Sequence, residues 1–465
     1  MMIDKNLIYD VVIIGAGPAG LFAAMQLSDQ GKKVLLIDQG PDLDERVIQS
    51  QKNEVTPFGF GGSGGFSDGK VIFSTETGGR LSDLMEIVKL NNYIQTTQQI
   101  WRKFSSGLSV DDFTELSNQG LKDKAASYNL HLIVSDTLHI GTDILPSVLQ
   151  RMRNYLIENN VDMVMDTTVD MIINRNFTAP GYILGEMSKF RTVAHSPDDE
   201  YFFDSNNIII APGRGGSKWL SEQIESLGLD RIPTPVDIGV RVEVPAKVTE
   251  HLTNELYEFK LKYQTPSYND WVRTFCVCPY GQVSLEKYES TTLVNGYSNK
   301  NKNSQNTNFA FLSSIQLGPP LSKPLEFSEN IIRTTNSIAN GALVQRLGDL
   351  MRHKRTKSLD GNNVEPTLLD ASPGDLGLAY PYRFVTNILE GLKAIDKMAP
   401  GIFSDDTLLY APEIKLYSSM ADVDENMMSK IDGLYFIGDG SGVTRGIAQA
   451  CVTGLISADH ILNKK

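Results

Sequence analysis

A strand followed at once by a glycine-rich turn, near the start of the chain, constrains the fold more than any other feature. Residues Val11–Ile14 form an unbroken apolar run, as in a strand covered on both faces, and G-A-G-P-A-G follows at 15–20. Apolar residues then recur at helical spacing up to Ser28, and the run K-V-L-L-I-D at 33–38 predicts a second buried strand. This order predicts a unit that binds a dinucleotide.

The residues of this turn have physical roles in such a unit. Gly15 allows the tight turn, Gly17 removes a side chain that would keep a diphosphate off the backbone, and Gly20 lets helix and strand pack closely. Pro18 suits the first helical turn, whose free amides and partial positive charge favour a diphosphate. Asp38 ends the second strand, where a carboxylate is expected to accept the ribose hydroxyls of an adenosine.

A second motif near the other end of the chain distinguishes between dinucleotides. The run G-L-Y-F-I-G-D-G at 433–440 predicts a buried strand that ends in Gly438-Asp439, and R-G-I at 445–447 begins a helix that reaches about Ile461. A domain that binds NAD does not require this piece. In a flavin site the acid can bind the ribityl chain, and the helix can direct its positive end at the pyrimidine edge of the flavin. The sequence therefore predicts FAD.

Composition narrows the class of protein. The 465 residues are 41% hydrophobic and 21% charged, which is typical of soluble globular domains, and the length suggests about three domains. The net charge of −13 disfavours binding to nucleic acid or to an anionic membrane. No apolar run reaches the ~20 residues of a membrane span, and the polar first residues predict no secretory signal. Three cysteines fit a reducing cytoplasm, so we expect a cytoplasmic protein.

The remaining chain predicts a discontinuous nucleotide-binding domain and a second domain. Residues 241–372 contain short β-like runs divided by turns, which indicate an antiparallel substrate domain closed by a helical stretch at about 328–353. A second G-x-G-x-x-G with its strand and helix is absent from the sequence, so we expect no separate nicotinamide domain. We expect the FAD-binding domain to consist of three parts, at 1–80, 131–240 and 373–465. A helical insertion or lid is expected at 81–130, and the substrate domain at 241–372.

Motifs along nearly the whole chain resemble, in order, those of a family of largely uncharacterised FAD-dependent dehydrogenases with a glutathione-reductase-like FAD fold. They include F-G-G-S-G-G-F-S-D-G-K, A-P-G-R-G-G-S-K-W-L, V-D-I-G-V-R-V-E, V-R-T-F-C-V-C-P and G-L-Y-F-I-G-D-G-S-G-V-T-R-G-I. The resemblance implies noncovalent FAD, a backbone contact of Val169 with the adenine, and an exit from the FAD domain at 207–214. The overall expectation is an α/β fold: a discontinuous Rossmann-like FAD-binding domain and a second α+β substrate domain with an antiparallel sheet.

The expected site residues follow from these motifs. The interleaved aromatic and charged residues of the glycine-rich loop at 59–70 favour contact with a flavin over a flexible linker. Residues expected to bind the cofactor are Gly15, Gly17, Pro18, Ala19, Gly20, Asp38, Gln39, Arg46, Gly62, Ser63, Gly64, Gly65, Val169, Ala211, Gly213, Gly438, Asp439, Arg445, Gly446 and Ile447. Candidate catalytic residues are Lys70, Arg445, Cys276 and Cys278.

The two cysteines, two positions apart on an expected strand, should project to one face as free thiols. His, Cys and acidic residues show no metal-ligand spacing. These features predict a dehydrogenase or reductase that transfers hydride between a small organic substrate and FAD. An amine or amino-acid oxidase, an ene-reductase, and a binding protein that keeps FAD as a structural group stay as alternatives. The substrate, the electron donor or acceptor and the oligomeric state are left open.

Overall fold

The computed structural model divides into two compact units. Unit 1 comprises 1–114, 135–232 and 419–465, and unit 2 comprises 115–134 and 233–418. Segment 373–418, expected with the FAD-binding domain, lies in unit 2, and the expected insertion 81–130 is divided between the units. The structure describes residues 7–51, 57–66, 69–113, 118–141, 143–175, 188–213, 215–233, 235–256, 258–288, 291–297, 304–317, 324–339, 341–415 and 419–464.

A seven-stranded sheet forms the centre of unit 1. The strand order is β7-β2-β1-β10-β9-β8, and β22 also pairs with β10. Strands β7, β2, β1, β10 and β22 are parallel to one another. Strand β9 pairs antiparallel with both β10 and β8. The long strand β10 joins both parts, since its first half pairs with β9 and its second half with β1. The strands are β1 (Ile8–Ile14), β2 (Val34–Ile37), β7 (Asp162–Val164), β8 (Thr168–Asn174), β9 (Phe190–His195), β10 (Glu200–Ile210) and β22 (Leu434–Phe436).

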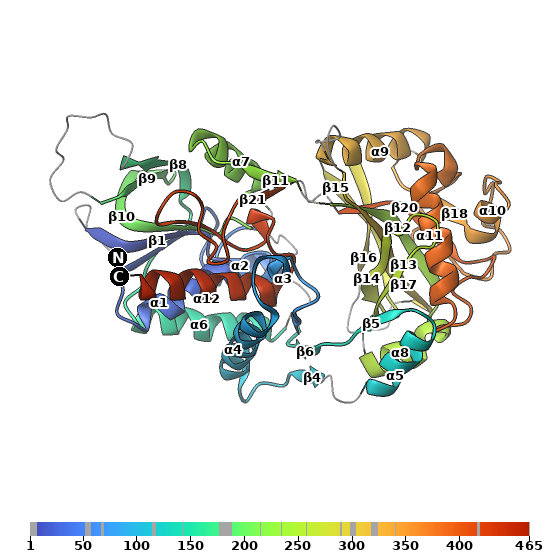
Figure 1. Cartoon of the computed structure of the whole chain (residues 1–465), viewed down its shortest axis with the longest axis horizontal. Helices are drawn as coiled ribbons and strands as arrows, with labels where there is room; N and C mark the ends of the chain where they lie inside the picture. The colour runs from blue at the N-terminus through green and yellow to red at the C-terminus, as the bar shows by residue number, and fades with distance from the viewer. Residues whose placement is uncertain are drawn as a thin grey trace. The chain divides into compact units, whose positions relative to one another are not determined.

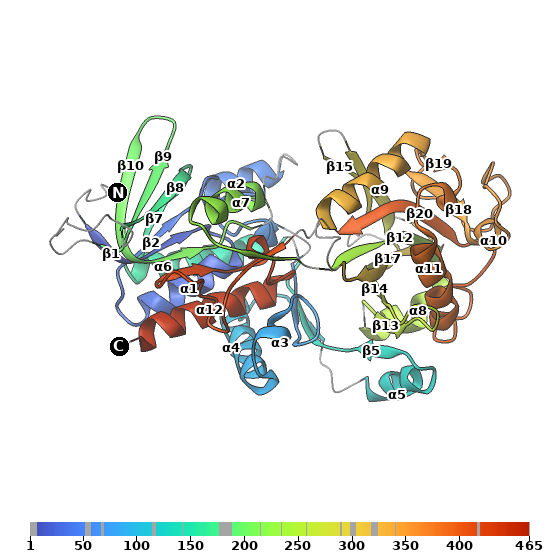
Figure 2. The same cartoon turned by 45° about the horizontal axis from the view of Figure 1, so that its top comes forward.

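Three helices lie along one face of this sheet, as both ribbon views show (Figures 1 and 2): α1 (Pro18–Ser28), α6 (Leu145–Glu158) and α12 (Ile447–Asn463). Small residues let α1 and α12 pack closely, because a Cβ added at Gly454 would lie 2.2 Å from the carbonyl oxygen of Ala19. Helix α4 (Ile87–Ser105) packs against α12 and α6. The N-terminal ends of α1 and α12 lie close together, since a Cβ added at Gly64 would be 3.1 Å from both Pro18 and Ile447.

Shorter elements complete unit 1. A small sheet of β3 (Lys70–Phe73), β6 (Asp136–His139) and β4 (Asp111–Phe113) follows the glycine-rich loop, and β11 (Arg231–Pro233) pairs with β21 (Ser419–Ala421). The remaining helices are α2 (Leu43–Gln51), α3 (Leu81–Leu84) and α7 (Ser217–Ser226), with 3-10 turns at Gly64–Phe66 and Asp439–Ser441.

Unit 2 is built on an eight-stranded sheet of order β19-β18-β20-β12-β17-β14-β13-β5, antiparallel except for the β18–β19 pair. A hairpin, β15 (Gln282–Tyr288) and β16 (Thr291–Tyr297), forms a separate two-stranded sheet that packs against β20. The strands of the large sheet are β5 (His131–Ile133), β12 (Val236–Pro245), β13 (Lys260–Gln264), β14 (Trp271–Cys278), β17 (Asn306–Ile315), β18 (Leu343–Arg346), β19 (Ser372–Pro373) and β20 (Leu408–Lys415). The helices are α5 (Gln119–Ser127), α8 (Ala246–Leu256), α9 (Pro324–Ala339), α10 (Leu347–Met351) and α11 (Tyr382–Ile395), with a 3-10 turn at Leu376–Leu378.

Strand β12 is buried along nearly its whole length but has two chemically different faces. Ile238, Val240, Val242 and Val244 alternate into the hydrophobic core, which also contains Phe384, Ile388 and Leu392 of α11. The residues between them, Asp237, Arg241 and Glu243, are buried and charged. The central strand of unit 2 therefore supports an apolar core on one side and a polar centre on the other.

Two expectations on unit 2 have different outcomes. The antiparallel strands expected within 241–372 are present and include β14, β15, β16 and β17. The expectation of one helical stretch at about 328–353 is wrong, because α9 ends at Ala339 and β18 follows at Leu343. Pairing of β18 with β20 satisfies the backbone of an apolar segment that helix propensity alone would continue.

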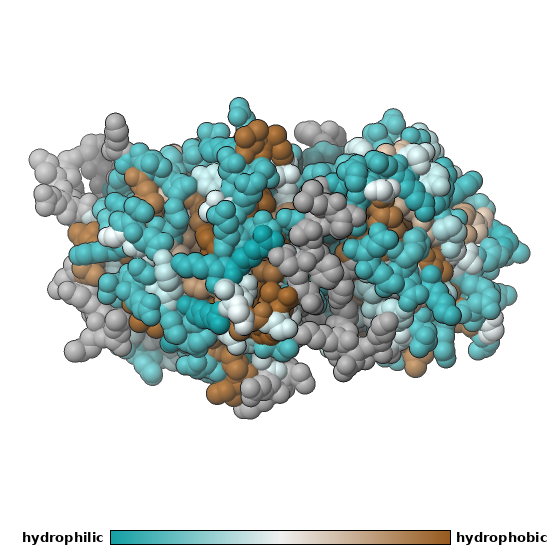
Figure 3. Space-filling view, turned by 90° about the horizontal axis from the view of Figure 1, so that it is seen from below, coloured by the Kyte–Doolittle hydropathy of each residue, from teal (hydrophilic) through white to brown (hydrophobic). Residues whose placement is uncertain are grey.

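Hydrophilic side chains predominate on the face in Figure 3, with hydrophobic ones in small groups among them. Among the residues that the structure describes, no helix has both the length and the apolar character needed to cross a membrane.

Candidate functional site: a nucleotide cavity in unit 1

A cavity of about 270 Å³ lies in unit 1 where the parallel strands β1, β2 and β10 end. This edge of a parallel sheet is where ligands bind in open α/β folds. The cavity is lined by Ile14, Gly15, Gly17, Pro18, Ala19, Ile37, Asp38, Gln39, Pro57, Phe58, Gly62, Ser63, Gly64, Thr167, Thr168, Val169, Ala211, Pro212, Gly213, Gly216, Trp219, Gly438, Asp439, Arg445, Gly446, Ile447 and Ala450.

Three helices begin at this cavity. Gly17, Gly216 and Gly446 are the N-caps of α1, α7 and α12, and all three line the cavity. None of these caps has a side-chain hydrogen bond to the first turn, and none of the three first turns contains an acidic residue. The helix amides and the positive ends of the helix dipoles are thus not neutralised by side chains at these caps or first turns. This arrangement suits an elongated, anionic ligand.

The three glycines of the first turn differ in what the protein itself demands of them. A Cβ added at Gly15 would lie 2.0 Å from the carbonyl oxygen of Ala211, and one at Gly20 would lie 2.0 Å from that of Gly15. At Gly17 the nearest atom is the Cα of Gly62, at 3.9 Å, which is an ordinary contact. Packing therefore requires glycine at 15 and 20, whereas a side chain at 17 would only fill cavity space. This fits a diphosphate placed against the backbone at Gly17.

Asp38 holds the walls of the cavity together. Its Oδ1 accepts the backbone N–H of Gly40 at 2.9 Å and that of Gly59 at 2.7 Å, and its Oδ2 accepts the N–H of Ala16 at 2.8 Å. A carboxylate offers about four acceptor sites on its two oxygens, so Oδ1 is fully used and Oδ2 keeps one. Asp38 thus joins β2, the glycine turn and the glycine-rich loop, and the remaining site of Oδ2 can accept a ligand hydroxyl.

Arg46 shapes the glycine-rich loop from behind. Its Nη1 donates to the carbonyl oxygens of Phe60 at 2.7 Å and Gly62 at 2.9 Å, and its guanidinium lies over the ring of Phe66. Burial lowers the pKa of Arg46 to about 10, with Asp38 opposing that shift. Although expected among the cofactor-binding residues, Arg46 does not line the cavity; it is 2% exposed and holds the loop in place.

Gly20 and Gly65, also expected to bind the cofactor, support the cavity from outside its lining. Gly20 lies against the turn at Gly15, and a Cβ added at Gly65 would approach Leu149 of α6 to 2.8 Å. The other expected cofactor-binding residues line the cavity. In the motif of the glycine-rich loop, Ser67 and Asp68 lie outside the described residues.

The end of the cavity at β22 and α12 is fixed by hydrogen bonds. The hydroxyl of Thr444 donates to Oδ1 of Asp439 at 2.8 Å, and the backbone N–H of Arg445 donates to the carbonyl oxygen of Gly78 at 2.7 Å. Gln449, in the first turn of α12, donates to the carbonyl oxygens of Ser74 and Thr77. These bonds tie the start of α12 to segment 74–78 and hold Asp439 and Arg445 at the cavity wall.

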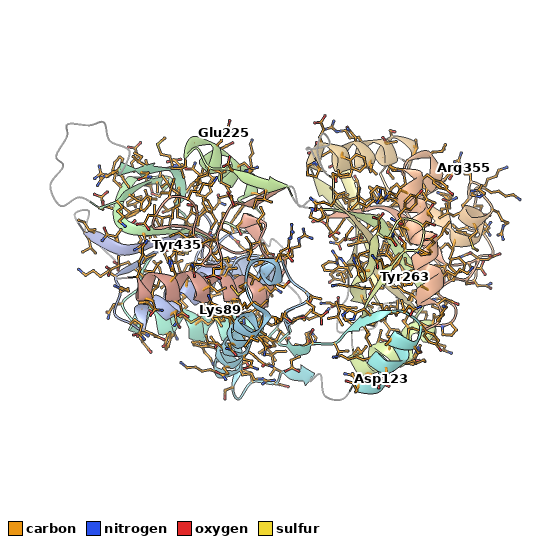
Figure 4. The ribbon with its side chains drawn as sticks, in the orientation of Figure 1. Lys89, Asp123, Glu225, Tyr263, Arg355 and Tyr435 are labelled. Carbon is orange, nitrogen blue, oxygen red and sulfur yellow. The ribbon has the colours of Figure 1, made fainter. Side chains whose placement is uncertain are left out.

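Helix α7 contributes wall residues that sequence reasoning missed. A register shift between Val169 and Met171 interrupts the pairing of β8 with β9. Gln223 of α7 fills the gap: its amide oxygen accepts the N–H of Ile172, and its amide nitrogen donates to the carbonyl oxygen of Asp170, both at 3.1 Å. The indole N–H of Trp219 reaches the same carbonyl oxygen at 3.3 Å. Figure 4 shows Glu225 on the outer side of α7, away from this contact.

The missed lining residues include Trp219, Phe58 and the pair Thr167-Thr168. The signal available for Trp219 was the glycine pair before Ser217. It indicates a possible helix start after a buried strand. The aromatic residue at 58, next to a run of glycines, was the signal for Phe58.

The candidate catalytic residues are dispersed. Arg445 lines the cavity, whereas Lys70 lies at the start of β3, opposite His139 of β6, and does not line it. Cys276 and Cys278 are on β14 of unit 2, and neither is in a disulfide. The expectation that they project to one face does not hold, because a bulge between Phe275 and Cys278 breaks the alternation and Cys276 has φ +48°. In the described part of the chain, no group of His, Cys and acidic side chains is arranged to hold a metal ion.

Comparisons with known proteins match both units. Residues 10–46 match the family described as FAD binding domain, and residues 235–415 match the family described as FAD-dependent protein, C-terminal domain-like. The chain is 25% identical over 496 aligned residues to a protein of Clostridium beijerinckii (strain ATCC 51743 / NCIMB 8052) described as uncharacterized, covering 97% of this chain and 80% of that protein.

Two further comparisons cover different shares of the chain. An NADH:fumarate oxidoreductase of Klebsiella pneumoniae (strain 342) is 24% identical over 169 residues, which are 36% of this chain and 17% of that protein. Among solved structures, glycine oxidase from Geobacillus kaustophilus is similar with a TM-score of 0.38 and 12% identity, covering 98% of this chain and 95% of that chain.

Proposed function

We propose that this chain, which is an FAD-dependent oxidoreductase, acts as a dehydrogenase or reductase on a small organic substrate with noncovalently bound FAD. The family matches confirm the sequence-based prediction of FAD as the cofactor. The observation that supports the proposal most strongly is the start of three helices, without capping side chains, at one cavity of unit 1. Such a cavity favours a nucleotide diphosphate and a flavin that becomes anionic when reduced.

We assign parts of the cavity to parts of FAD. The amides at the start of α1, with Gly17 leaving the backbone open, would hold the diphosphate. The remaining acceptor site on Oδ2 of Asp38 would take a ribose hydroxyl, and Val169 would meet the adenine. Asp439 and the start of α12 would hold the ribityl chain and the flavin.

The bound FAD would supply the hydride chemistry, so the protein needs to bind, orient and shield it. The N-terminal end of α12 would stabilise negative charge that develops nearby. Arg445, at the same wall, adds a permanent positive charge because an arginine side chain stays protonated. Ile447 and Ala450 present apolar surface to the cavity and limit the entry of water.

The first test is the flavin content of the purified protein. We expect a yellow protein that contains about one FAD per chain and releases it intact when it is denatured. A Gly17→Val variant provides the flavin-free control, because the branched side chain would occupy the space assigned to the diphosphate. A wild-type protein that neither contains nor takes up FAD would refute the assignment.

The second test separates the proposed reaction from its alternatives. Candidate small organic substrates are added anaerobically to the oxidised protein, or to the reduced protein, while the flavin absorbance is recorded. A substrate-dependent change supports a dehydrogenase or reductase, stoichiometric release of peroxide in air identifies an oxidase, and no response to any substrate class favours a binding protein. We expect NADH and NADPH to bind weakly, and the cytoplasmic location stays a prediction from the sparse cysteines.

A further inference from the structure

The polar face of the large sheet in unit 2 is covered at one end and partly exposed at the other. At the covered end the hairpin β15–β16 lies against it, since a Cβ added at Gly296 would lie 1.6 Å from Nη2 of Arg241. Arg241 has no exposed surface there. At the other end the strands carry partly exposed side chains, among them Arg273 and Phe275 of β14 and Lys415 of β20. This second end is the part of the polar face that a dissolved molecule can reach.

The pairing of the strands brings these side chains together. Ala310 of β17 lies opposite both Arg241 of β12 and Phe275 of β14, so all three share one face. The guanidinium carbon of Arg273 is 5.2 Å from the centre of the Phe275 ring. The Nζ of Lys415 is 5.7 Å from the same point. Two cations therefore flank one aromatic ring, and we call Arg273, Phe275 and Lys415 the Phe275 cluster.

Buried carboxylates hold both cations of the cluster. Nη2 of Arg273 donates to Oδ2 of Asp237 at 2.6 Å. Nζ of Lys415 donates to Oε1 of Glu413 at 2.5 Å. The side chains of the two carboxylates are 2% and 0% exposed, against 22% for the arginine and 17% for the lysine. A dissolved molecule that reaches the cluster thus meets the cations more than the carboxylates. In the described residues Arg273 hydrogen-bonds only through Nη2, so its Nε and Nη1 can still donate to a ligand.

This ion-paired group contains more cations than carboxylates. Oε2 of Glu413 is 3.9 Å from Nη1 of the buried Arg241, so Glu413 is shared between Arg241 and Lys415. With the pair of Arg273 and Asp237, three cationic side chains therefore share two carboxylates. Burying cationic groups without matching negative charge is costly. A single anion bound at the Phe275 cluster would balance the group.

The adjacent charged residues extend the same contrast between the two ends. Glu243 lies further along β12, towards the covered end, and accepts the hydroxyl of Tyr410 at 2.6 Å. Lys262 of β13 lies directly opposite Arg273 and adds a cation to the same face. The exposed end of the face is thus locally basic, although the whole chain has a net charge of −13. A basic patch of this size favours a small anion.

We propose that the Phe275 cluster binds the carboxylate of a small organic acid, and that such an acid is the substrate of the oxidoreductase. Arg273 donates charge-assisted hydrogen bonds to the carboxylate, and Lys415 adds a second positive charge. The ring of Phe275 offers apolar surface beside these charges, which favours an organic anion over an inorganic one. The binding site stands on the contacts within unit 2, whereas the identity of the acid as the substrate rests on the proposed function.

The deciding experiment titrates the FAD-loaded protein with benzoate and measures the dissociation constant from the NMR signals of the ligand. Benzamide, which is neutral and nearly isosteric, and inorganic phosphate are the comparison ligands. We expect benzoate to bind more tightly than either. Arg273→Gln should weaken benzoate binding at least ~10-fold, because hydrogen bonds from a charged donor are lost. The matched control is Arg352→Gln, since Arg352 pairs with Asp405 at the surface, and it should bind benzoate as the wild type does.

Three results overturn the proposed site: no saturable binding of benzoate, binding of benzamide or phosphate as tight as that of benzoate, or equal benzoate affinity in Arg273→Gln and the wild type. Arg273→Gln leaves the buried Asp237 without its cation, so the variant can fail to fold. The double variant Asp237→Asn with Arg273→Gln removes both charges together and should show the same loss of affinity. Lys415→Gln tests the second cation independently.

A separate measurement tests the identity of the substrate. Small carboxylic acids and their amides are added anaerobically while the flavin absorbance is recorded. We expect some acids but none of the amides to change the absorbance, and the half-saturating acid concentration to rise at least ~10-fold in Arg273→Gln. Amides that act as well as their acids overturn the assigned substrate class. If benzoate binds as expected but neither acids nor amides change the absorbance, the site is supported, and the proposed function fails together with the substrate assignment.

Discussion

The two units build their polar centres from different parts of the chain. In unit 1 the cavity wall consists largely of glycines, strand ends and helix amides, and its carboxylate, Asp38, is bonded to three backbone N–H groups. In unit 2 the centre consists of side chains, with Arg241, Asn308, Cys278 and Glu413 assembled from four strands. A backbone site depends on space next to the chain, whereas a side-chain site depends on every partner being present.

This difference predicts opposite responses to substitution. In unit 1, adding atoms should be most harmful, because the ligand must approach the backbone. In unit 2, removing atoms should be most harmful, because each lost partner leaves a buried polar group or charge uncompensated. The four predictions below test this contrast in order of decreasing effect.

The largest effect is expected at Gly17. We expect Gly17→Ala to weaken FAD binding and Gly17→Val to abolish it, a loss of at least ~10,000-fold or about 5.6 kcal/mol, while the fold is kept. The reason is that an added Cβ contacts only Gly62, at 3.9 Å, and otherwise occupies the cavity. Titration of the apo-protein with FAD, followed by flavin fluorescence, measures the dissociation constant.

Gly120→Val is the matched control, because an added Cβ at Gly120 meets nothing within 4 Å. Its FAD affinity should equal that of the wild type. Normal FAD affinity in Gly17→Val, with circular dichroism equal to wild type, would contradict the assignment of the diphosphate to this turn.

The next effect is expected in unit 2. Arg241→Met removes the donor to Asn308 and to both cysteines, and breaking a buried charged network of this kind typically costs about 3–5 kcal/mol. Arg352→Met is the matched control, since Arg352 pairs with Asp405 at the surface and such pairs contribute about 0–1 kcal/mol. Urea denaturation of unit 2, followed by hydrogen exchange in its strands, measures the loss. Equal losses in the two variants would show that the buried centre does not stabilise unit 2.

The same contrast explains how much of each unit could be predicted from the sequence. Most of the cavity wall was predicted, because glycine spacing and strand ends leave a local pattern in the sequence at 15–20 and 438–447. Arg46 was expected at the cavity, but its side chain turns to the loop carbonyls, a choice that no local pattern encodes. Trp219 was missed because its place depends on the bulge at Asp170 and on the docking of α7.

The polar centre of unit 2 could not be predicted, although its motifs were noticed. Arg241 and Cys278 are 37 positions apart, and their contact depends on the pairing of β12 and β14 with β17 and on a bulge that alternation does not reveal. Similarly, the helical pattern expected at about 328–353 is broken by β18, because pairing with β20 outweighs local propensity. Long-range pairing, rather than residue type, decides both cases.

A smaller effect is expected where α7 contacts β8. Gln223→Ala leaves the N–H of Ile172 without its acceptor and removes one donor to the carbonyl oxygen of Asp170, which should destabilise this contact by about 1–3 kcal/mol. Because α7 carries Gly216 and Trp219 of the cavity wall, FAD affinity should fall by roughly threefold to tenfold, an effect of about 0.6–1.4 kcal/mol. Isothermal titration with FAD measures it.

Glu222→Ala is the control, on the exposed face of the same helix, and should leave FAD affinity unchanged. If both variants bind FAD equally well, the contact of Gln223 with β8 does not position the cavity wall.

The smallest expected effect is a pH dependence of the stability of unit 1. It is caused by Asp204 on β10, which forms ion pairs with Arg175 and Arg191. Hydrogen bonds from Arg191, then the charge of Arg175, hold the pKa of Asp204 below its ordinary value, although burial opposes this. A lowered pKa in the folded state means that the stabilisation is present above the unfolded pKa of about 3.9 and is lost as the pH falls through the folded pKa.

Asp204→Asn removes this contribution, which should stay below about 1 kcal/mol because the carboxylate is partly exposed to solvent. The difference in melting temperature between wild type and variant should be constant from about pH 5 to 7 and should shrink below about pH 4.

Asp432→Asn is not a suitable control, because its partners, Lys189 and Lys464, also hold the pKa of that carboxyl low. Glu222, exposed on α7, is suitable: Glu222→Gln should change the melting temperature little at any pH. A difference for Asp204→Asn that does not vary with pH would mean that its charge does not stabilise unit 1, leaving backbone packing as the source of that stability.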